Sequence, residues 1–274
     1  MRLVTLVENT ANRVGLVGEH GLACLIEVGE ESVLWDTGQG NALLPNAEKL
    51  EVDLASLAGI ALSHGHFDHS GGLQELLTRI GPRTVWAHPA AFVGKFAVRA
   101  GEAERDIGMP NPRAELEAAG ARVQTFEGPT ELVPGVLASG AVPRVTDFEP
   151  VSPRFKVREN GSFAPDLLPD DQFLVVESAA GPVVVLGCAH SGLINTLLYA
   201  AELARTRHFA AVVGGTHLVD ADEVRLERTA TELRQFDIDC LAACHCTGFR
   251  GQVALWQAFG ERFRVVNTGD VLES

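Results

Sequence analysis

Apolar runs alternate with amphipathic stretches along most of the chain, and this pattern predicts an α/β fold. Residues 1–7 have the alternation of a strand with one buried face. Residues 22–28 and 32–35 are largely apolar and enclose Gly29-Glu30-Glu31, which predicts a hairpin. Further strands are expected at residues 57–62, 83–87 and 122–126, and helices at residues 41–51, 72–79 and 90–99.

The last third of the chain repeats strand and helix in strict order. Two apolar segments, residues 172–177 and 182–187, predict another hairpin. Asp220 and Glu223 have the spacing of a capping box at the start of a helix. The other elements are expected to be helices at residues 193–205, 222–236 and 252–259, and strands at residues 210–213, 240–243 and 263–266. Two sheets between two layers of helices would bury the apolar faces of all these elements.

A chain of 274 residues can bury a substantial core, either as one domain or as two closely packed halves. We expect a single domain over residues 1–274. Residues 106–171 are rich in Pro and Gly and are expected to form a loop-rich insertion. Within this region, residues 143–169 are expected to be a loop that borders the functional site.

The composition is that of an ordinary soluble protein, with 46% hydrophobic and 21% charged residues. A formal net charge of −14 argues against nucleic acid as a partner, because binding phosphates requires cations. No apolar run approaches the roughly eighteen residues that span a bilayer, and the first residues turn polar too soon for a signal peptide. Five widely spaced cysteines do not suggest a disulfide framework, so a cytoplasmic location is expected. The oligomeric state is left open.

Candidate chemistry is concentrated in residues 63–72, Ser-His-Gly-His-Phe-Asp-His-Ser-Gly-Gly, here called the histidine motif. His64 and His66 are two positions apart, so in an extended chain they project to the same side and can bind one ion. Asp68 and His69 follow the turn at Gly65 and can bind a second ion beside the first. Imidazole and carboxylate ligands suit zinc, with iron(II) and manganese(II) as alternatives. The other interpretation is a polar loop that is merely rich in histidine.

Three further histidines, His190, His217 and His245, each follow an apolar run that predicts a strand. Strands that alternate with helices place their carboxyl ends at one edge of a sheet, so these side chains are expected to converge. We assign His190 to the first ion and His245 to the second. His217 is expected to face the substrate or to lie beside the ligands, with direct coordination as the alternative.

The histidine motif resembles the signature of the metallo-β-lactamase fold superfamily, and residues 33–38 resemble the Asp-Thr-Gly turn that precedes it there. Other segments are similar to the subgroup of the archaeal dihydropterin–ribofuranosylaminobenzene 5'-phosphate synthases and their bacterial relatives. These segments are Glu19-His20-Gly21-Leu22, Asn46-Ala47 and residues 187–192, 214–218 and 244–248. The resemblance covers nearly the whole chain and implies an αββα four-layer sandwich.

Two positions depart from the superfamily pattern. The resemblance implies a bridging carboxylate after Gly187 and a histidine before the preceding hairpin, where this chain has Cys188 and Asp170-Asp171. The ligands of the second ion, and the choice between one ion and two, are therefore open. The resemblance also implies that Asp36 accepts a proton from a ligating imidazole, whereas a simple Asx turn in the first hairpin is the alternative.

Several turns that follow candidate ligands open a helix, where free N–H groups can bind a phosphate or carboxylate. These turns are Ser70-Gly71-Gly72, Ser191-Gly192 and residues 247–251, which include Thr247 and Arg250. Arg250 could clamp the anion. The alternative is that the glycines only permit tight turns.

The cysteines near the last histidine have a different expected role. Cys244 and Cys246 flank His245 and would face away from it in an extended chain. We therefore expect both to be small, buried, apolar residues, as we do for Cys24 and Cys240. The alternative is that Cys244 and Cys246 belong to a cysteine-rich metal site around His245.

Together these residues predict a metal-dependent hydrolase with one or two ions, acting on a small anionic substrate that carries a phosphate. Asp68 would orient the attacking water or accept its proton. The resemblance implies an alternative activity, in which a synthase joins a dihydropterin diphosphate to ribofuranosylaminobenzene phosphate. A metal-binding sensor without turnover is the third candidate.

Overall fold

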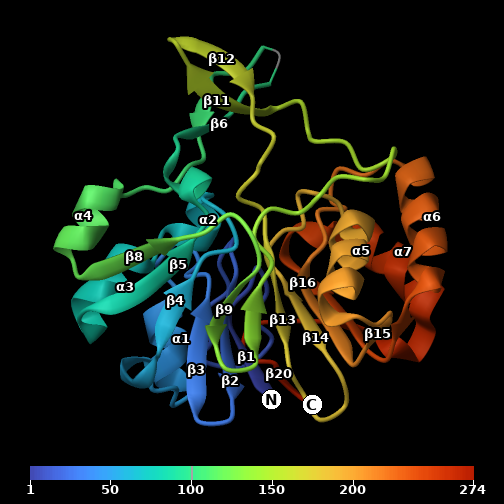
Figure 1. Ribbon diagram of the computed structural model, residues 1–274, viewed down its shortest axis with the longest axis horizontal. Helices are drawn as coiled ribbons and strands as arrows, with labels where there is room; N and C mark the ends of the chain where they lie inside the picture. The colour runs from blue at the N-terminus through green and yellow to red at the C-terminus, as the bar shows by residue number, and fades with distance from the viewer. Residues whose placement is uncertain (100) are drawn as a thin grey trace.

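Two seven-stranded sheets pack face to face, and helices cover the outer surface of each (Figure 1). The computed structural model describes residues 1–99 and 101–274. The expected αββα sandwich is confirmed.

The strands of the first sheet come mainly from the first half of the chain. In spatial order they are β20 (Val271–Glu273), β1 (Arg2–Val7), β2 (Ala23–Val28), β3 (Glu31–Trp35), β4 (Gly59–Ala61), β5 (Arg83–Ala87) and β8 (Ala121–Thr125). The second sheet has the order β19 (Phe263–Val265), β18 (Leu241–Cys244), β16 (Ala211–Gly215), β14 (Val183–Leu186), β13 (Phe173–Val176), β10 (Val136–Ala138) and β9 (Thr130–Val133). A short parallel pair, β15 (His208–Phe209) and β17 (Asp237–Ile238), lies apart from both.

The helices form the two outer layers. Beside the first sheet lie α1 (Leu43–Lys49), α3 (Leu73–Ile80) and α4 (Arg113–Ala118), and beside the second lie α5 (Leu193–Ala204), α6 (Glu223–Glu232) and α7 (Gly248–Phe259). The short α2 (Phe67–Ser70) and the 3-10 turns η1 (Leu54–Ser56), η2 (Pro89–Phe92), η3 (Leu233–Gln235), η4 (His245–Thr247) and η5 (Gly260–Arg262) complete the set. No helix in residues 1–99 or 101–274 combines the length and apolar character that a bilayer crossing needs.

The central core lies between the inner faces of the two sheets. Strands of both sheets contribute to one cluster of buried side chains, among them Ile26, Trp35, Val176 and Val183. The Trp35 indole N–H also donates a hydrogen bond of 3.2 Å to the carbonyl of Leu186 in the opposite sheet. This pairing satisfies a polar atom that would otherwise be costly to bury.

Each sheet combines an antiparallel half with a parallel half, and the parallel half carries the candidate site. Strands β3, β4, β5 and β8 run parallel in one sheet, and β14, β16, β18 and β19 run parallel in the other. The segments that contain His64, His190, His217 and His245 all follow the carboxyl ends of such strands. The sheet topology therefore brings the histidines to one edge of the sandwich.

A small four-stranded sheet stands above this edge (Figure 1). It has the order β12 (Ser162–Pro165), β11 (Phe155–Glu159), β6 (Lys95–Ala97) and β7 (Arg105–Asp106). Two expectations from the sequence are wrong in this region. Residues 90–99 form a 3-10 turn and a strand instead of a helix, and the loop expected at residues 143–169 contains two strands. Both segments pair with chain far away in sequence, which local periodicity cannot reveal.

The start of α6 also differs from the expected capping box. Asp222, not Asp220, is the N-cap, and its carboxylate accepts a hydrogen bond of 2.8 Å from the backbone N–H of Arg225. Asp220 instead forms an ion pair with Arg154. An N-cap must precede the first helical residue directly, and the helix begins later than the sequence pattern suggested.

Candidate metal centre

The histidine motif leaves the end of β4 as a tight turn that the surrounding backbone fixes in place. A Cβ atom at Gly65 would lie 2.0 Å from the carbonyl oxygen of Ala91, so only glycine fits there. The N–H of Gly65 donates a hydrogen bond of 2.8 Å to one carboxylate oxygen of Asp170. The backbone between His64 and His66 is thus held by a buried carboxylate.

Asp170 and Asp171, which occupy a position where the superfamily pattern implies a histidine, both bind backbone N–H groups. Asp171 accepts hydrogen bonds of 3.0 and 2.7 Å from the N–H groups of His190 and Ser191. The two adjacent carboxylates therefore hold the two loops that carry candidate ligands, His190 on one and the histidine motif on the other.

Three imidazole nitrogens of the first candidate site face one another. His64 Nε2 lies 2.9 Å from His66 Nδ1 and 3.2 Å from His190 Nε2. Two nitrogens bound about 2.0–2.1 Å from one tetrahedral zinc ion would lie about 3.3 Å apart. Burial lowers the pKa of His66 to about 3 and the pKa values of His64 and His190 well below the ordinary value. All three rings are therefore neutral, which is the form that binds metal.

A second group of donor atoms lies next to the first. His69 Nε2 lies 3.1 Å from His245 Nε2, and Asp68 Oδ2 lies 3.4 Å from His245 and 3.9 Å from His69. The thiol of Cys188 is 3.2 Å from His69 Nε2. The structure thus brings together the side chains that the sequence suggested for a second ion, with Cys188 among them.

The charges of Asp68 and His69 depend on each other. Burial by itself raises the pKa of Asp68, but the neighbouring imidazoles, above all that of His69, outweigh burial and hold this pKa well below its ordinary range. Burial by itself lowers the pKa of His69, but the carboxylates of Asp36 and Asp68 outweigh it and raise this pKa to about 9. At neutral pH Asp68 is therefore ionised, and His69 carries a proton that a metal ion would displace.

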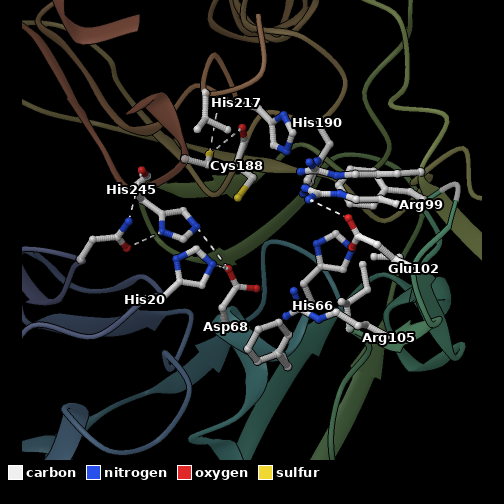
Figure 2. A pocket seen from close by; sticks show the side chains of 18 of the residues that line it. His20, His66, Asp68, Arg99, Glu102, Arg105, Cys188, His190, His217 and His245 are labelled. Atoms are coloured by element: carbon white, nitrogen blue, oxygen red, sulfur yellow. Dashed lines mark hydrogen bonds and ion pairs between the residues drawn. The ribbon is translucent and has the colours of Figure 1, made fainter. Parts of the chain in front are cut away.

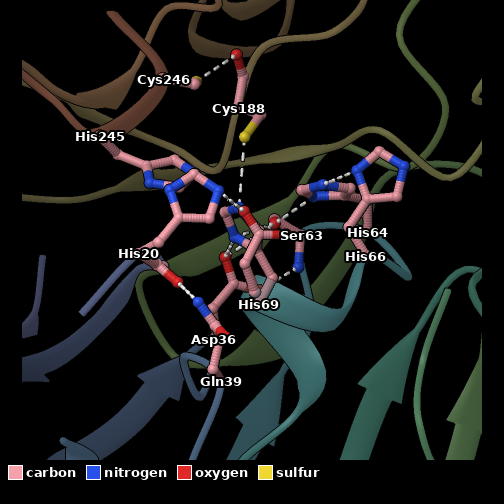
Figure 3. A network of polar contacts seen from close by, with 12 residues as sticks. His20, Asp36, Gln39, Ser63, His64, His66, His69, Cys188, His245 and Cys246 are labelled. Atoms are coloured by element: carbon pink, nitrogen blue, oxygen red, sulfur yellow. Dashed lines mark hydrogen bonds and ion pairs between the residues drawn. The ribbon is translucent and has the colours of Figure 1, made fainter. Parts of the chain in front are cut away.

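Asp36 and Ser63 contact the Nδ1 atoms of His69 and His64 and so orient these two rings (Figure 3). Asp36 Oδ2 lies 2.7 Å from His69 Nδ1 and also accepts the hydroxyl of Ser63 at 2.7 Å. The Ser63 hydroxyl is 2.8 Å from His64 Nδ1. The expected contact between Asp36 and an imidazole is therefore present, although Asp36 follows β3 and does not lie in the hairpin turn. Such contacts set which ring nitrogen is free for a metal.

Four non-glycine residues around the site have left-handed backbone conformations. They are Asp36 (φ 62°), Ala189 (φ 53°), His217 (φ 47°) and His245 (φ 51°). This conformation costs about 1–2 kcal/mol per residue, and such strain is concentrated at functional sites. At each position the chain turns sharply at a strand end, and the turn directs a site residue inward.

Two site residues were missed from the sequence. The His20 imidazole lies 3.2 Å from Asp68 Oδ2, opposite His66 in the pocket (Figure 2). Asn9 Oδ1 lies 3.0 Å from His245 Nδ1 and so fixes the orientation of that ring. The Glu19-His20-Gly21-Leu22 segment was a signal for His20. Asn9 follows the end of β1, but no helix comes after it, so it does not fit the strand–helix pattern of the other histidines.

A pocket of about 430 Å³ opens above the donor atoms. His217 lines it, with its ring centroid 4.4 Å from that of His190, and burial lowers its pKa to about 4. Phe67 and Phe155 form an aromatic wall, since both line the same pocket. Arg99, Arg105, Arg154 and Glu102 also line it.

Two of the three expected anion sites at helix starts are closed by the protein itself, and the third, residues 247–251, does not line the metal-centre pocket. Glu149 accepts hydrogen bonds of 2.9 Å from the N–H groups of Ile194 and Asn195 at the start of α5. Ser191 is buried, and its N–H is bound by Asp171. After Ser70, the N–H groups of Gly71 and Gly72 donate to the carbonyls of Phe67 and Gly38 at 2.8 and 3.2 Å. The Thr247 hydroxyl donates to the carbonyl of Cys244, and Arg250 lines a separate groove between α6 and α7. The structure does not bring Arg250 to the metal-centre pocket.

The expectation for the cysteines holds for Cys244 but not for Cys246. Cys244 is buried in the core between the sheets. The Cys246 thiol lines the pocket and lies within 4.8 Å of the donor atoms of Cys188 and His245. The sequence prediction assumed an extended chain, in which Cys246 would face away from His245. It is wrong because His245 to Thr247 form a 3-10 turn.

Comparison with known proteins agrees with this geometry. A sequence profile described as "Metallo-beta-lactamase superfamily" matches residues 17–245. The chain belongs to the metallo-β-lactamase superfamily.

Individual relatives match over almost the whole chain. One is the 7,8-dihydropterin-6-methyl-4-(beta-D-ribofuranosyl)-aminobenzene-5'-phosphate synthase of Methanocaldococcus jannaschii, which is 29% identical over 100% of this chain and 96% of its own length. An uncharacterized protein of the same archaeon is 31% identical over 92% of this chain and 93% of its own length. The crystal structure of Tm1679, described as a metal-dependent hydrolase of the β-lactamase superfamily, has a TM-score of 0.85 and 30% identity and covers 100% of this chain and 99% of its own.

Proposed function

We propose that this protein is a metal-dependent hydrolase that uses one or two zinc ions and acts on a small, phosphate-bearing molecule. The observation that carries the proposal is the convergence of His64, His66 and His190, whose ring nitrogens lie 2.9 and 3.2 Å apart at the base of a pocket. A second group, formed by Asp68, His69, Cys188 and His245, lies beside it. Nitrogen, sulfur and carboxylate donors in this number suit zinc better than calcium or magnesium.

A divalent ion held by these side chains would supply a Lewis acid and lower the pKa of water in the pocket to near neutrality. Asp68 is ionised at neutral pH, so its carboxylate can orient a water molecule or accept its proton. The contact of 3.2 Å between His20 and Asp68 holds the carboxylate in position. The rings of Phe67 and Phe155 exclude solvent from one wall of the pocket, which strengthens electrostatic interactions within it.

A second candidate is the synthase reaction that joins a dihydropterin diphosphate to ribofuranosylaminobenzene phosphate. The relative with that name is 29% identical over the whole length of this chain, which favours the candidate. Both reactions require the protein to bind a phosphorylated substrate beside the same donor atoms. They differ in whether water or a second organic substrate attacks.

The test is an assay of zinc-loaded protein on phosphodiester, lactone and thioester substrates, with a parallel synthase assay that measures release of diphosphate. We expect zinc-dependent hydrolysis of a phosphate-bearing substrate by the wild type. Replacement of Asp68 by Asn should reduce turnover by about 10²–10⁴-fold.

Metal analysis must accompany the variants, because Asp68 is also a candidate ligand. His20→Gln removes the group that holds Asp68 and should lower turnover while the zinc content stays at the wild-type value. Asp53→Asn, at the exposed residue that caps η1, is the matched control and should behave as the wild type. Stoichiometric zinc with no turnover of any substrate would contradict the proposal and favour a sensor.

A further inference from the structure

We infer that Arg99, Arg105 and Arg154 form a binding site for a phosphate or diphosphate group at the mouth of the metal-centre pocket. This inference rests on the proposed function, because it assigns the residues that recognise the anionic end of the substrate. All three arginines line the pocket that contains the candidate ligands.

The small sheet places Arg154 beside Arg99 and Arg105, which lie about fifty residues earlier in the sequence. Arg99 lies two residues beyond the end of β6, Arg105 lies on β7, and Arg154 directly precedes β11. In Figure 2, Arg99 and Arg105 lie on the side of the pocket that holds His66, across from His20 and Asp68. A substrate with its phosphate on this side would extend its reacting end over the candidate metal ligands.

Three arginines line one pocket although the protein as a whole has a formal net charge of −14. Their partners in the part of the chain that the structure describes are few and solvent-exposed. Glu102 lies 4.0 Å from Arg99, and Asp220 pairs with Arg154, whereas no carboxylate lies within 4.0 Å of the Arg105 guanidinium in residues 1–99 and 101–274. Exposed ion pairs of this kind contribute little, so a phosphate with two charges can displace them.

Arg154 is also held in place before any ligand binds. Its guanidinium lies 4.8 Å from the centroid of the Phe155 ring, and its side chain is only 22% exposed. A planar guanidinium stacked on an aromatic ring directs its N–H groups outward at the edge, and those that do not bind Asp220 remain available to an anion. Such preorganisation reduces the entropy that binding costs.

The alternative anion sites are closed or lie outside the metal-centre pocket. Glu149 fills the start of α5, and Arg250 faces another groove, as described above. Of the positively charged side chains, the three arginines are the ones that line the pocket in the described residues. Three guanidinium groups match the several oxygens of a phosphate or diphosphate better than the two oxygens of one carboxylate.

The test is calorimetric titration of zinc-loaded protein with inorganic pyrophosphate, followed by metal analysis to show that zinc is retained. Arg99→Gln and Arg105→Gln change exposed side chains, so the variants should fold normally. Each should weaken pyrophosphate binding about tenfold or more, because each removes charge-assisted hydrogen bonds. Arg154→Gln should have a similar effect, but it also removes packing on Phe155.

Two further variants make the test specific. Glu102→Gln removes the carboxylate that competes for Arg99 and should strengthen pyrophosphate binding, which a loosened fold would not do. Arg250→Gln, outside the pocket, is the matched control and should bind as the wild type. Unchanged affinity in both Arg99→Gln and Arg105→Gln would overturn the inference. The titration needs no turnover, so an inactive protein with arginine-dependent binding would contradict only the proposed hydrolase function.

Discussion

Asp36 shows how one buried carboxylate prepares an imidazole for a metal ion. Its two oxygens accept hydrogen bonds of 2.7 Å from the Ser63 N–H and hydroxyl, and one lies 2.7 Å from His69 Nδ1. This arrangement leaves His69 Nε2 directed at His245 and Cys188. The orientation of the ring therefore depends on a residue that no metal ion would contact.

Asp36→Asn should weaken zinc binding by about 10–100-fold, because the amide cannot replace the charge that orients His69. The comparison should be made above pH 9, because the pKa of metal-free His69 is about 9 and proton competition becomes small only above that value. Competition with a zinc-binding dye measures the affinity. Asp239→Asn is the matched control, since Asp239 contacts His208 at 3.0 Å on the exposed surface. Equal loss of affinity in both variants would contradict this role of Asp36.

The effect of Asp36 on His69 also leads us to predict how metal binding depends on pH. The pKa of His69 is raised to about 9, above the ordinary value of 6.5, so the metal-free ring is protonated at neutral pH. Zinc binding at this ring must then release a proton, and the affinity should rise with pH up to about 9 and change little above it. Calorimetry at pH 7 in buffers of different ionisation enthalpy measures the released protons. We expect the wild type to release more protons on zinc binding than Asp36→Asn does. Equal proton release by the two proteins would refute the prediction.

At the scale of elements, a buried lysine connects the small sheet to the histidine motif. Lys95 on β6 is buried, and its ammonium lies 3.0 Å from Asp166 and 2.9 Å from Asp170. Asp170 in turn accepts the N–H of Gly65 between two candidate ligands. Burial alone lowers the pKa of Lys95, but the two carboxylates outweigh it and raise this pKa, so the lysine is charged.

Lys95→Met should destabilise the protein by about 3–5 kcal/mol, because it leaves two buried carboxylates without a counter-charge. Urea unfolding measured by fluorescence gives the free energy of unfolding of each variant. Lys156→Met, on the neighbouring strand β11, is the matched control and should cost much less, since Lys156 is only partly buried. If the two substitutions cost the same, the buried ion pairs do not stabilise this region.

For the whole molecule, the candidate ligands lie on both halves of the sandwich. The histidine motif follows β4 of the first sheet, whereas His190 and His245 follow β14 and β18 of the second. An ion bound by both sets would link the two sheets at the edge where the pocket opens. The metal should therefore contribute to the stability of the fold as well as to chemistry.

Zinc at about 100 times its dissociation constant should stabilise the native state by about 2.7 kcal/mol, and raise the unfolding temperature by roughly 5–10 °C over protein treated with chelator. Differential scanning calorimetry measures the shift. The shift should shrink strongly in His245→Ala. It should remain in His208→Ala, which changes a partly exposed histidine outside the site. Identical unfolding temperatures with zinc and with chelator would rule out a link between the sheets.

The sequence predicted most of the two large sheets because their elements are locally consistent. The strands β14, β16 and β18 are continuous apolar runs followed by helices of regular spacing. It failed at residues 90–99 and 143–169, where β6 pairs with β11 across a large sequence separation and the β11–β12 hairpin extends that pairing. It also missed the positions of His20 and Asn9, which reach the site from segments outside the strand–helix rhythm.

By itself, the sequence determined the chemical kind of the site, since the spacing of His64, His66, Asp68 and His69 limits what the turn can bind. Only the tertiary structure decided which donor atoms meet, because a metal site depends on distances between segments that the chain order leaves free. It showed that Asp170 and Asp171 bind backbone N–H groups and that Cys246 turns into the pocket. It also placed the arginines at the pocket mouth, because the pairing of β6 with the remote strand β11 brings Arg154 beside Arg99 and Arg105.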